Sequence, residues 1–222
     1  IVKFMIGFSK KIMIADVLNN ITVEVFENTN ELSTLIVWLG AISYSLQLYY
    51  DFSGYSDMAI GICNMVGYDC PSNFNYPYTT KSIADFWRRW HISLGAWFRD
   101  YVYIPLGGSR RGKARLLINL FIVWLLTGIW HGARWTFIIW GLNYFIIIAF
   151  EKITGWPEKL SNKPFKIVYR IISLLIINFQ WVIFRSANLH QGFTFIKTMC
   201  TNISISSSSS RAWFLLKDYG VF

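Results

Sequence analysis

The stretch LLINLFIVWLLTGIWHGARWTFIIWGLNYFIIIAF (residues 116–150) decides the fold class of this chain. Two apolar blocks, 116–130 and 133–150, flank a short interruption that holds His131 between Gly128 and Gly132. Long apolar runs of this kind are typical of helices that cross a membrane. We therefore predict a helical hairpin with His131 at its turn. If Arg115 marks the membrane boundary, this turn falls within the bilayer, because 15 residues of helix span only about 22 Å.

The composition of the whole chain agrees with a membrane protein. Hydrophobic residues make up 54% of the sequence, aromatic residues 18% and charged residues only 15%, and the mean hydropathy is positive. These values lie outside the usual range of soluble domains. We predict an all-α, multi-pass transmembrane protein that forms a single membrane-embedded unit over residues 1–222. Because the chain opens on Ile1, we expect it to be cut from a longer protein.

Further segments are assigned by their length and polarity. Residues 32–50 are nearly uncharged and long enough for a transmembrane helix, and residues 165–184 predict another span. Residues 51–68 carry Asp51 and Asp57, so we expect a buried or broken segment with both carboxylates facing inward. The sequence SISSSSS (204–210) predicts a flexible loop outside the membrane.

The net charge of +9 comes from 21 Lys and Arg against 12 Asp and Glu. Most basic residues flank the apolar blocks, notably at 105–115 and 151–166, where the positive-inside tendency predicts cytoplasmic loops. We therefore expect the lipid bilayer as a partner and no nucleic acid. Three cysteines lack both a C-x-x-C pair and a histidine at zinc spacing, so we predict neither a disulfide framework nor a metal site.

A second unusual segment runs from residue 82 to Pro105 and is rich in Trp, Tyr and Arg. Ser82 and Asp85 form the S-x-x-D signature of a helix N-terminus. We predict one amphipathic helix, interfacial or buried, in which helical spacing puts four residues on one face: Trp87, His91, Gly95 and Phe98. Arg88 and Arg89 lie within ion-pair reach of Asp85 but could instead bind an anionic ligand.

The two histidines are the residues that suggest chemistry. An ionisable group at membrane depth is a functional candidate by default, yet His131 could equally be a neutral residue bonded to a backbone carbonyl. Gly128 and Gly132 would let a substrate or another helix approach its imidazole closely. For His91 the residues alone favour a structural role. Two histidines without a metal pattern indicate proton transfer, because imidazole suits acid–base work near neutral pH.

Three segments together resemble the membrane-bound O-acyltransferase family, in particular the bacterial branch that includes the alginate O-acetylation membrane protein. They are LQLYYDFSGYSDMAIGICNMVGY (46–68), NFNYPYTTKSIADFWRRWHISLGAWFRDYVYIPLGG (73–108) and LTGIWHGARWTFIIWGLNY (126–144). The resemblance covers roughly residues 4–200. It implies a ring of tilted helices around a tunnel, which the acyl donor enters from the cytoplasm and the acceptor from outside. Since relatives carry more helices on both sides, we expect the isolated chain to be inactive.

The resemblance also implies site residues and a reaction. The histidine of the W-H-G motif, here His131, would be catalytic, and that of R-R-W-H, here His91, would be a second functional position. We expect His131 to act as general base on an acceptor hydroxyl that attacks an acyl thioester, while His91 or Asn119 polarises the reacting groups. The remaining expected tunnel or donor contacts are Arg88, Arg89 and Trp130.

The substrates implied by the resemblance are an acyl donor and a polymer. The donor would be a thioester co-substrate, acetyl-CoA or an acyl carrier, with no bound cofactor. The acceptor would be a polysaccharide or cell-wall polymer outside the bacterial cytoplasmic membrane, and a periplasmic or extracellular acetyl-handling protein is the expected partner. Two alternatives stay open: a teichoic acid D-alanylation protein and a non-enzymatic exporter of polysaccharide or lipid.

Overall fold

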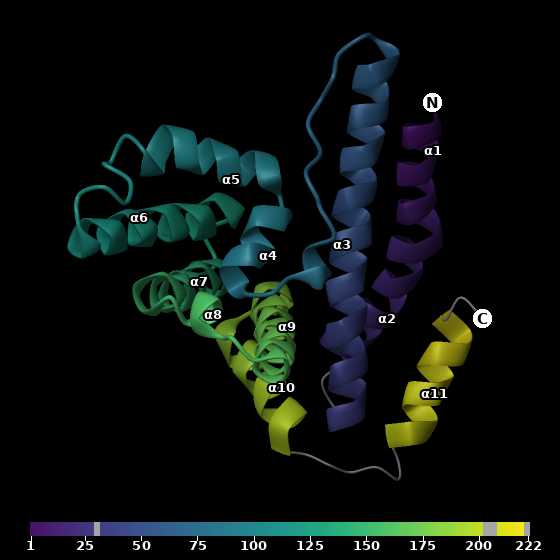
Figure 1. The fold of residues 1–222 in the computed structure, drawn as a ribbon. Helices are drawn as coiled ribbons and strands as arrows, with labels where there is room; N and C mark the ends of the chain where they lie inside the picture. Colours follow the sequence, from purple (N-terminus) through teal and green to yellow (C-terminus); the bar gives the residue numbers. More distant parts are fainter. Residues whose placement is uncertain (29–31, 202–207, 220–222) are drawn as a thin grey trace. The chain divides into compact units, whose positions relative to one another are not determined.

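The computed structural model describes residues 1–28, 32–201 and 208–219, and every regular element within these ranges is a helix (Figure 1). The all-α prediction is confirmed. The chain divides into two compact units: Ile1–Ser72 with Trp181–Phe222, and Asn73–Gln180. That residues 1–222 form a single membrane-embedded unit stays a prediction. The helix α9 (Lys163–Arg185) begins in the second unit and ends in the first, so the chain returns to its first unit along one continuous helix.

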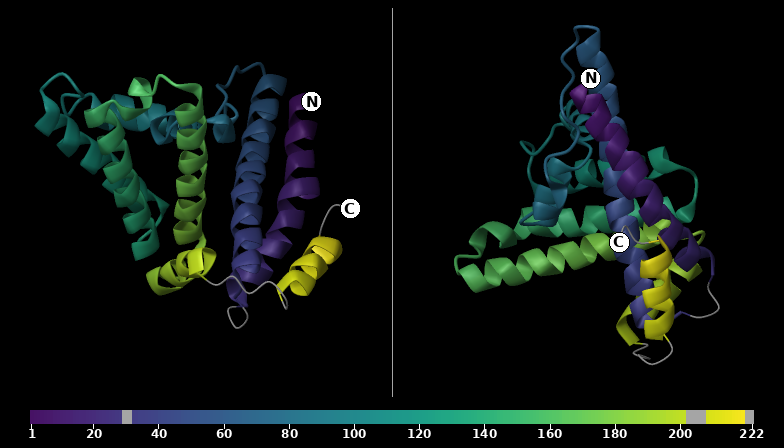
Figure 2. Two further views of the ribbon diagram at one scale, coloured as in Figure 1. Left: turned by 60° about the horizontal axis from the view of Figure 1, so that its bottom comes forward. Right: turned by 90° about the vertical axis from the view of Figure 1, so that its right-hand side faces the viewer.

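The first unit is built around one long helix. Three shorter helical segments lie along it, side by side in both views of Figure 2. The segments are α1 (Val2–Ser9), the π-helix η1 (Lys10–Ala15) and α2 (Asp16–Glu27), and the long helix is α3 (Thr34–Met65). A Cβ on Gly54 would lie 2.7 Å from the Gly7 oxygen, and one on Gly61 would lie 2.6 Å from the Phe4 nitrogen. Glycine at these positions therefore lets the backbones of α1 and α3 approach closely.

Residues 51–65 continue α3 without a break, so the expectation of a broken segment is wrong. Their acidic side chains face the N-terminal helices. Asp57 pairs with Lys10 at 2.6 Å and with Lys3 at 3.6 Å, and Asp51 pairs with Lys11 at 2.8 Å. Because these lysines neutralise the carboxylates, an apolar helix tolerates them without interrupting its backbone.

Two C-terminal helices complete the first unit and contact α3. They are α10 (Leu189–Thr201) and α11 (Ser208–Tyr219). The loop predicted over 204–210 lies outside the described residues up to position 207. It is wrong for the last three serines, which form the first turn of α11, a place where serine is well tolerated.

The second unit holds the predicted hairpin and the segment around His91. Its longest helices, α6 (Lys113–His131) and α7 (Trp135–Thr154), pack against each other and confirm the helical pair predicted over 116–150. The other elements are η3 (Pro77–Thr79), α4 (Ile83–Arg89), α5 (Ile92–Phe98), the π-helix η4 (Arg99–Tyr103), α8 (Trp156–Lys159) and the start of α9.

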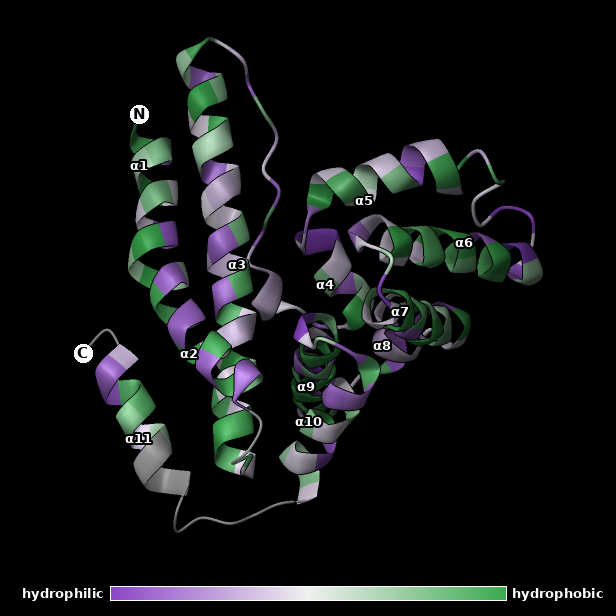
Figure 3. Ribbon diagram, turned by 180° about the vertical axis from the view of Figure 1, so that it is seen from behind, coloured by the Kyte–Doolittle hydropathy of each residue, from purple (hydrophilic) through white to green (hydrophobic). Residues whose placement is uncertain are grey.

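Three described helices are long and apolar enough to cross a membrane: α6, α7 and α9. Hydrophobic residues dominate α6 and α7 in Figure 3. The spans predicted in the 116–150 hairpin and at 165–184 therefore agree with the structure. Residues 34–50 are helical as predicted, but α3 is not among the three, because polar residues follow its apolar first half. The depth of the turn at His131 stays a prediction.

Candidate active site

A break between two short helices positions His91. The helix predicted to run from residue 82 to Pro105 is wrong at this point: α4 ends at Arg89, Trp90 is extended, and His91 adopts the left-handed conformation with φ +47°. Left-handed backbone is uncommon for residues other than glycine, and such outliers concentrate at functional sites. The left-handed backbone at His91 therefore changes the chain direction between α4 and α5 at the residue that carries the imidazole.

The loop before α4 stabilises this break. The backbone N–H of Asn75 donates to the Arg89 oxygen at 3.0 Å, and the backbone N–H of Ile92 donates to the Asn73 oxygen at 3.0 Å. The Asn73 side-chain oxygen also accepts from the N–H of Ser93 at 3.0 Å and from its hydroxyl at 2.6 Å. These bonds satisfy backbone groups that the interrupted helix leaves open.

The start of α4 is held by two kinds of cap. The Ser82 hydroxyl accepts a 3.1 Å hydrogen bond from the Asp85 N–H, so the predicted helix N-terminus is confirmed. In addition, Glu151 of α7 is buried and its carboxylate accepts from the backbone N–H groups of Ile83 and Ala84, both at 2.8 Å. A carboxylate is a favourable partner for the positive end of a helix. Glu151 thus fixes α4 to α7.

The end of α6 positions His131. Gly132 follows it with φ +138°, a conformation that L side chains rarely adopt. A Cβ on Gly128 would lie 2.7 Å from the backbone oxygen of Phe137 on α7, so of the two roles considered for this glycine, the approach of another helix is the one observed. The His131 ring packs edge-on against Trp140, with ring centroids 5.1 Å apart.

The structure brings the two histidines together around one indole. The Trp130 ring centroid lies 4.7 Å from that of His131 and 5.9 Å from that of His91. Trp130 itself is 57% exposed. Residues 40 positions apart in the sequence therefore form one cluster, which we call the histidine pair.

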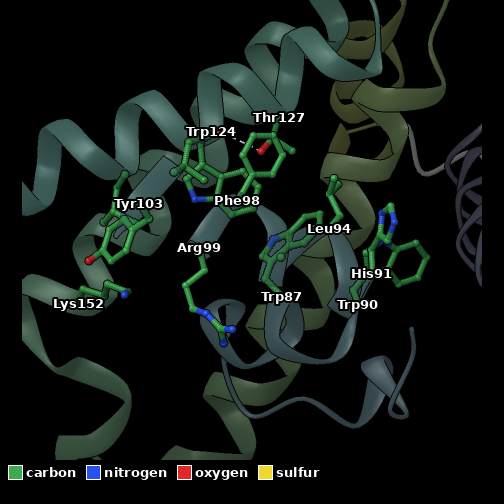
Figure 4. A pocket seen from close by; sticks show the side chains of 13 residues that line it. Trp87, Trp90, His91, Leu94, Phe98, Arg99, Tyr103, Trp124, Thr127 and Lys152 are labelled. Carbon is green, nitrogen blue, oxygen red and sulfur yellow. Dashed lines mark hydrogen bonds between the residues drawn. The ribbon is translucent and has the colours of Figure 1, made fainter. Parts of the chain in front are cut away.

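An aromatic cavity of about 290 Å³ opens beside His91 (Figure 4). His91 and Trp90 lie at one side of it, and Tyr103, Arg99 and Lys152 lie at the other. The cavity lining includes all four residues predicted to share one helix face: Trp87, His91, Gly95 and Phe98. They meet there although the helix is interrupted between them. The remaining lining residues are Leu94, Leu120, Val123, Trp124 and Thr127. His131 is outside this lining.

Burial governs the protonation of His91. Desolvation in this apolar surrounding lowers the pKa of His91 to about 4. Its imidazole is therefore neutral at neutral pH, with one nitrogen that donates and one that accepts hydrogen bonds. A neutral imidazole can donate its N–H to a developing negative charge or accept a proton.

A second hollow shares lining residues with the cationic side of the aromatic cavity. Arg99 and Tyr103 also line a cavity of about 530 Å³ with Arg110 and Arg111 of the basic loop. Lys152 lies 5.7 Å from the centroid of the Tyr103 ring. The Tyr103 hydroxyl is buried and makes no hydrogen bond within the described residues. We call the cavity of about 530 Å³ the basic vestibule.

Three expected contacts, Asn119, Arg88 and Arg89, do not line the aromatic cavity. Asn119 is fully buried, and its amide group donates to the backbone oxygens of Leu106 at 3.3 Å and Gly108 at 2.9 Å. Both amide hydrogens are therefore used to hold the turn before α6. A role of Asn119 in polarising the reacting groups stays a prediction. Arg88 and Arg89 line a different cavity and pair with Asp85 at 3.6 and 3.0 Å.

The sequence reasoning missed four residues of this region: Arg99, Tyr103, Glu151 and Lys152. Glu151 directly follows the apolar block 133–150, so the sequence alone favours assigning this acidic residue to the loop after the block. An isolated carboxylate on an otherwise apolar helix was the signal that could have found it. Among the residues that the structure describes, no group of three or more His, Cys, Asp or Glu side chains could hold a metal ion.

The sequence of this chain is similar to those of known proteins. Residues 1–192 match the sequence profile of the membrane-bound O-acyltransferase family. The chain belongs to this family. Both members of the histidine pair lie within the matched range, as do the aromatic cavity and the basic vestibule.

Similar members of the family act on different polymers according to their names. The chain is 49% identical over 190 residues to the probable alginate O-acetylase AlgI of Pseudomonas syringae pv. tomato, covering 85% of this chain and 36% of that protein. It is 43% identical to the peptidoglycan O-acetyltransferase of Helicobacter pylori, with coverages of 88% and 37%. It is 32% identical to the teichoic acid D-alanyltransferase of Bacillus subtilis, with coverages of 85% and 51%. The chain thus spans between about a third and a half of these relatives.

Proposed function

We propose that the protein is a membrane O-acyltransferase that moves an acetyl group from a cytoplasmic thioester to hydroxyls of an extracytoplasmic polysaccharide or cell-wall polymer. The observation that carries this proposal is the histidine pair, which stands beside an apolar cavity with a cationic opposite side. Relatives named for O-acetylation of alginate and of peptidoglycan support the acetyl group and the polymeric acceptor. The bacterial cytoplasmic membrane is the proposed location.

The proposed reaction needs one base and one hydrogen-bond donor. His131 accepts the proton of the acceptor hydroxyl while its oxygen attacks the carbonyl carbon of the thioester. The neutral His91 imidazole donates its N–H to the oxyanion of the tetrahedral intermediate. When the carbon–sulfur bond breaks, the departing thiolate takes the proton from His131. The ester and the free thiol leave, and both histidines return to their starting states.

The donor path in this proposal runs from the basic vestibule to the histidine pair. Arg110 and Arg111 would hold the anionic part of acetyl-CoA or of an acyl carrier's prosthetic arm, whereas the Arg99 guanidinium pairs with Asp100 at 2.7 Å. The aromatic cavity would take the thin, uncharged part of the thioester arm. Arg88 and Arg89 are not on this path, because they line another cavity. Trp130, between the two imidazoles, would orient the acyl group.

The test measures ester-linked acetate on the surface polymer of cells that carry the wild type, His131→Ala or His131→Gln at equal membrane abundance. Loss of acetate in both variants supports the proposal, and unchanged acetate in either variant overturns the role of His131. Arg134→Gln is the matched control, since Arg134 lies over the ring of Phe137 near the same turn and lines neither the aromatic cavity nor the basic vestibule.

A second candidate acyl group is D-alanine, which the 32% identity to a teichoic acid D-alanyltransferase favours. Release of polymer esters in mild base, followed by separate detection of acetate and D-alanine, distinguishes the two. Acetate alone supports the proposal. If D-alanine is released from wild-type polymer but not from polymer of the His131→Ala variant, the proposed mechanism stands and the donor is a D-alanyl thioester. An acetyl-handling protein outside the membrane is the proposed partner, and its co-purification with the protein would support this pairing.

A further inference from the structure

A second basic cavity in the Asn73–Gln180 unit takes no part in the proposed reaction. It has a volume of about 550 Å³ and shares no lining residue with the aromatic cavity or the basic vestibule. The helix α4 with the two residues before it, the segment around α8 and the first turns of α9 form its walls. Two acidic residues, Asp85 and Glu158, line it together with five basic residues: Lys81, Arg88, Arg89, Lys166 and Arg170.

The positive charge of this cavity is only partly neutralised. Asp85 accepts hydrogen bonds from the Arg89 Nε and the Lys81 backbone N–H, both at 3.0 Å. Burial alone would raise the pKa of Asp85, but these partners hold it below its usual value. The Asp85 carboxylate is thus already engaged by residues of the cavity wall. Within the described ranges, the ammonium and guanidinium groups of Lys81, Lys166 and Arg170 have no ion-pair partner.

The position of the cavity suits a ligand from the membrane. It lies at the start of α9 and beside α8, the short helix that follows α7, and both α7 and α9 are long and apolar enough to cross a bilayer. The ends of spanning helices lie at the level of the lipid headgroups, where basic pockets attract anionic lipids. Leu160 and Ile167 add apolar surface to the basic wall. Beyond the cavity, α9 continues with exposed apolar side chains at Val168, Ile171 and Ile172.

We propose that this cavity binds the phosphate of an anionic phospholipid, with the acyl chains along the exposed apolar side chains of α9. Lys166 and Arg170, one turn apart on α9, line the cavity and form no ion pair with a carboxylate among the described residues. The apolar lining and the continuing apolar side chains of α9 favour a lipid over a soluble phosphate compound. The proposal is independent of the acyl-transfer reaction.

The test is native mass spectrometry of the purified protein in detergent, titrated with phosphatidylglycerol or with phosphatidylcholine. We expect tighter binding of phosphatidylglycerol. The double variant Lys166→Gln/Arg170→Gln should weaken that binding about 30-fold, because each basic group near a membrane surface contributes about 1 kcal/mol. Since neither side chain has an ion-pair partner, the variant should keep the wild-type melting temperature and elution volume.

The matched control is Lys159→Gln/Lys163→Gln, which removes the same charge from the same connection without touching the cavity lining. Phosphatidylglycerol binding that survives the cavity variant, or falls equally in the control, overturns the proposal. A second titration uses soluble pyrophosphate in place of the lipid. If pyrophosphate binds with the same sensitivity to Lys166→Gln/Arg170→Gln and phosphatidylglycerol does not bind, the lipid assignment is overturned in favour of a soluble phosphate ligand.

Discussion

The Glu151 carboxylate accepts a 2.8 Å hydrogen bond from the backbone N–H of Ile83, and this bond joins α7 to the helix that leads to His91. The Tyr169 hydroxyl donates to the same carboxylate at 2.7 Å, so the group is bonded from two further elements of the unit. A buried carboxylate without these partners would be strongly unfavourable. Glu151 is therefore a structural support of the candidate active site, since its carboxylate is fully engaged by hydrogen bonds within the fold.

Replacing Glu151 by glutamine should lower the free energy of unfolding by about 2 kcal/mol, because an amide cannot accept from both Ile83 and Ala84 and presents its own N–H to one of them. Thermal unfolding in detergent, followed by tryptophan fluorescence, measures the change. Glu158→Gln is the control, since Glu158 is exposed and caps no helix in this unit. A Glu151→Gln melting temperature equal to that of the control would contradict the capping role.

The backbone at His91 predicts which substitutions the fold tolerates. His91→Asn should keep the melting temperature within a few degrees, because asparagine adopts left-handed backbone readily. His91→Val should cost about 1–2 kcal/mol of stability, because a β-branched residue is strained there. Both should abolish polymer acetylation if His91 contacts the reacting groups. Equal stability of the two variants would show that the break between α4 and α5 relaxes easily.

Stability should also depend on pH through His91. Its folded-state pKa is lowered to about 4, whereas an unfolded histidine titrates near 6.5. Between these values the unfolded chain binds the proton more readily, so the His91 contribution is fully present above about pH 6.5 and is lost as the pH falls toward 4. Melting temperatures of the wild type and His91→Asn at pH 7.5, 6 and 5 test this. The wild type should lose more on acidification, and parallel curves would contradict the prediction.

The close packing of α6 on α7 depends on Gly128. Gly128→Ala places a Cβ 2.7 Å from the Phe137 backbone oxygen, so the helices must separate at an expected cost of about 1–3 kcal/mol. Gly95→Ala is the contrasting variant, because the nearest atom to its Cβ is 4.0 Å away and alanine favours the helix. Unfolding experiments should show a loss for Gly128→Ala and no loss for Gly95→Ala. The reverse order would refute this packing.

The proposed donor path predicts a kinetic signature for the basic vestibule. Arg110→Gln/Arg111→Gln should raise the KM for the thioester donor several-fold and leave kcat nearly unchanged, because these groups attract the donor without touching its carbonyl. The increase should shrink at high salt, which screens exposed charges. Lys159→Gln/Lys163→Gln removes equal charge away from the vestibule and serves as control. A fall in kcat with constant KM would place these arginines at the chemical step instead.

Much of the architecture could be predicted from the order of residues alone. The apolar blocks at 116–130 and 133–150 and the basic residues that flank them predict packed helices in a membrane, and Ser82 with Asp85 predicts the start of α4. These features are local, since helix periodicity, capping and hydropathy act over a few turns. His131 and His91 could also be selected from motifs within short stretches of sequence.

Only the tertiary structure decided how these pieces form a site. The break at His91 depends on Asn73, which lies about twenty residues earlier, and the start of α4 depends on Glu151, 68 residues later. Asn119 carries a polar side chain like a catalytic donor, yet the turn before α6 uses its amide hydrogens. Such assignments are long-range because a buried polar group takes whichever partner the fold brings to it, and hydropathy along the chain does not record that choice.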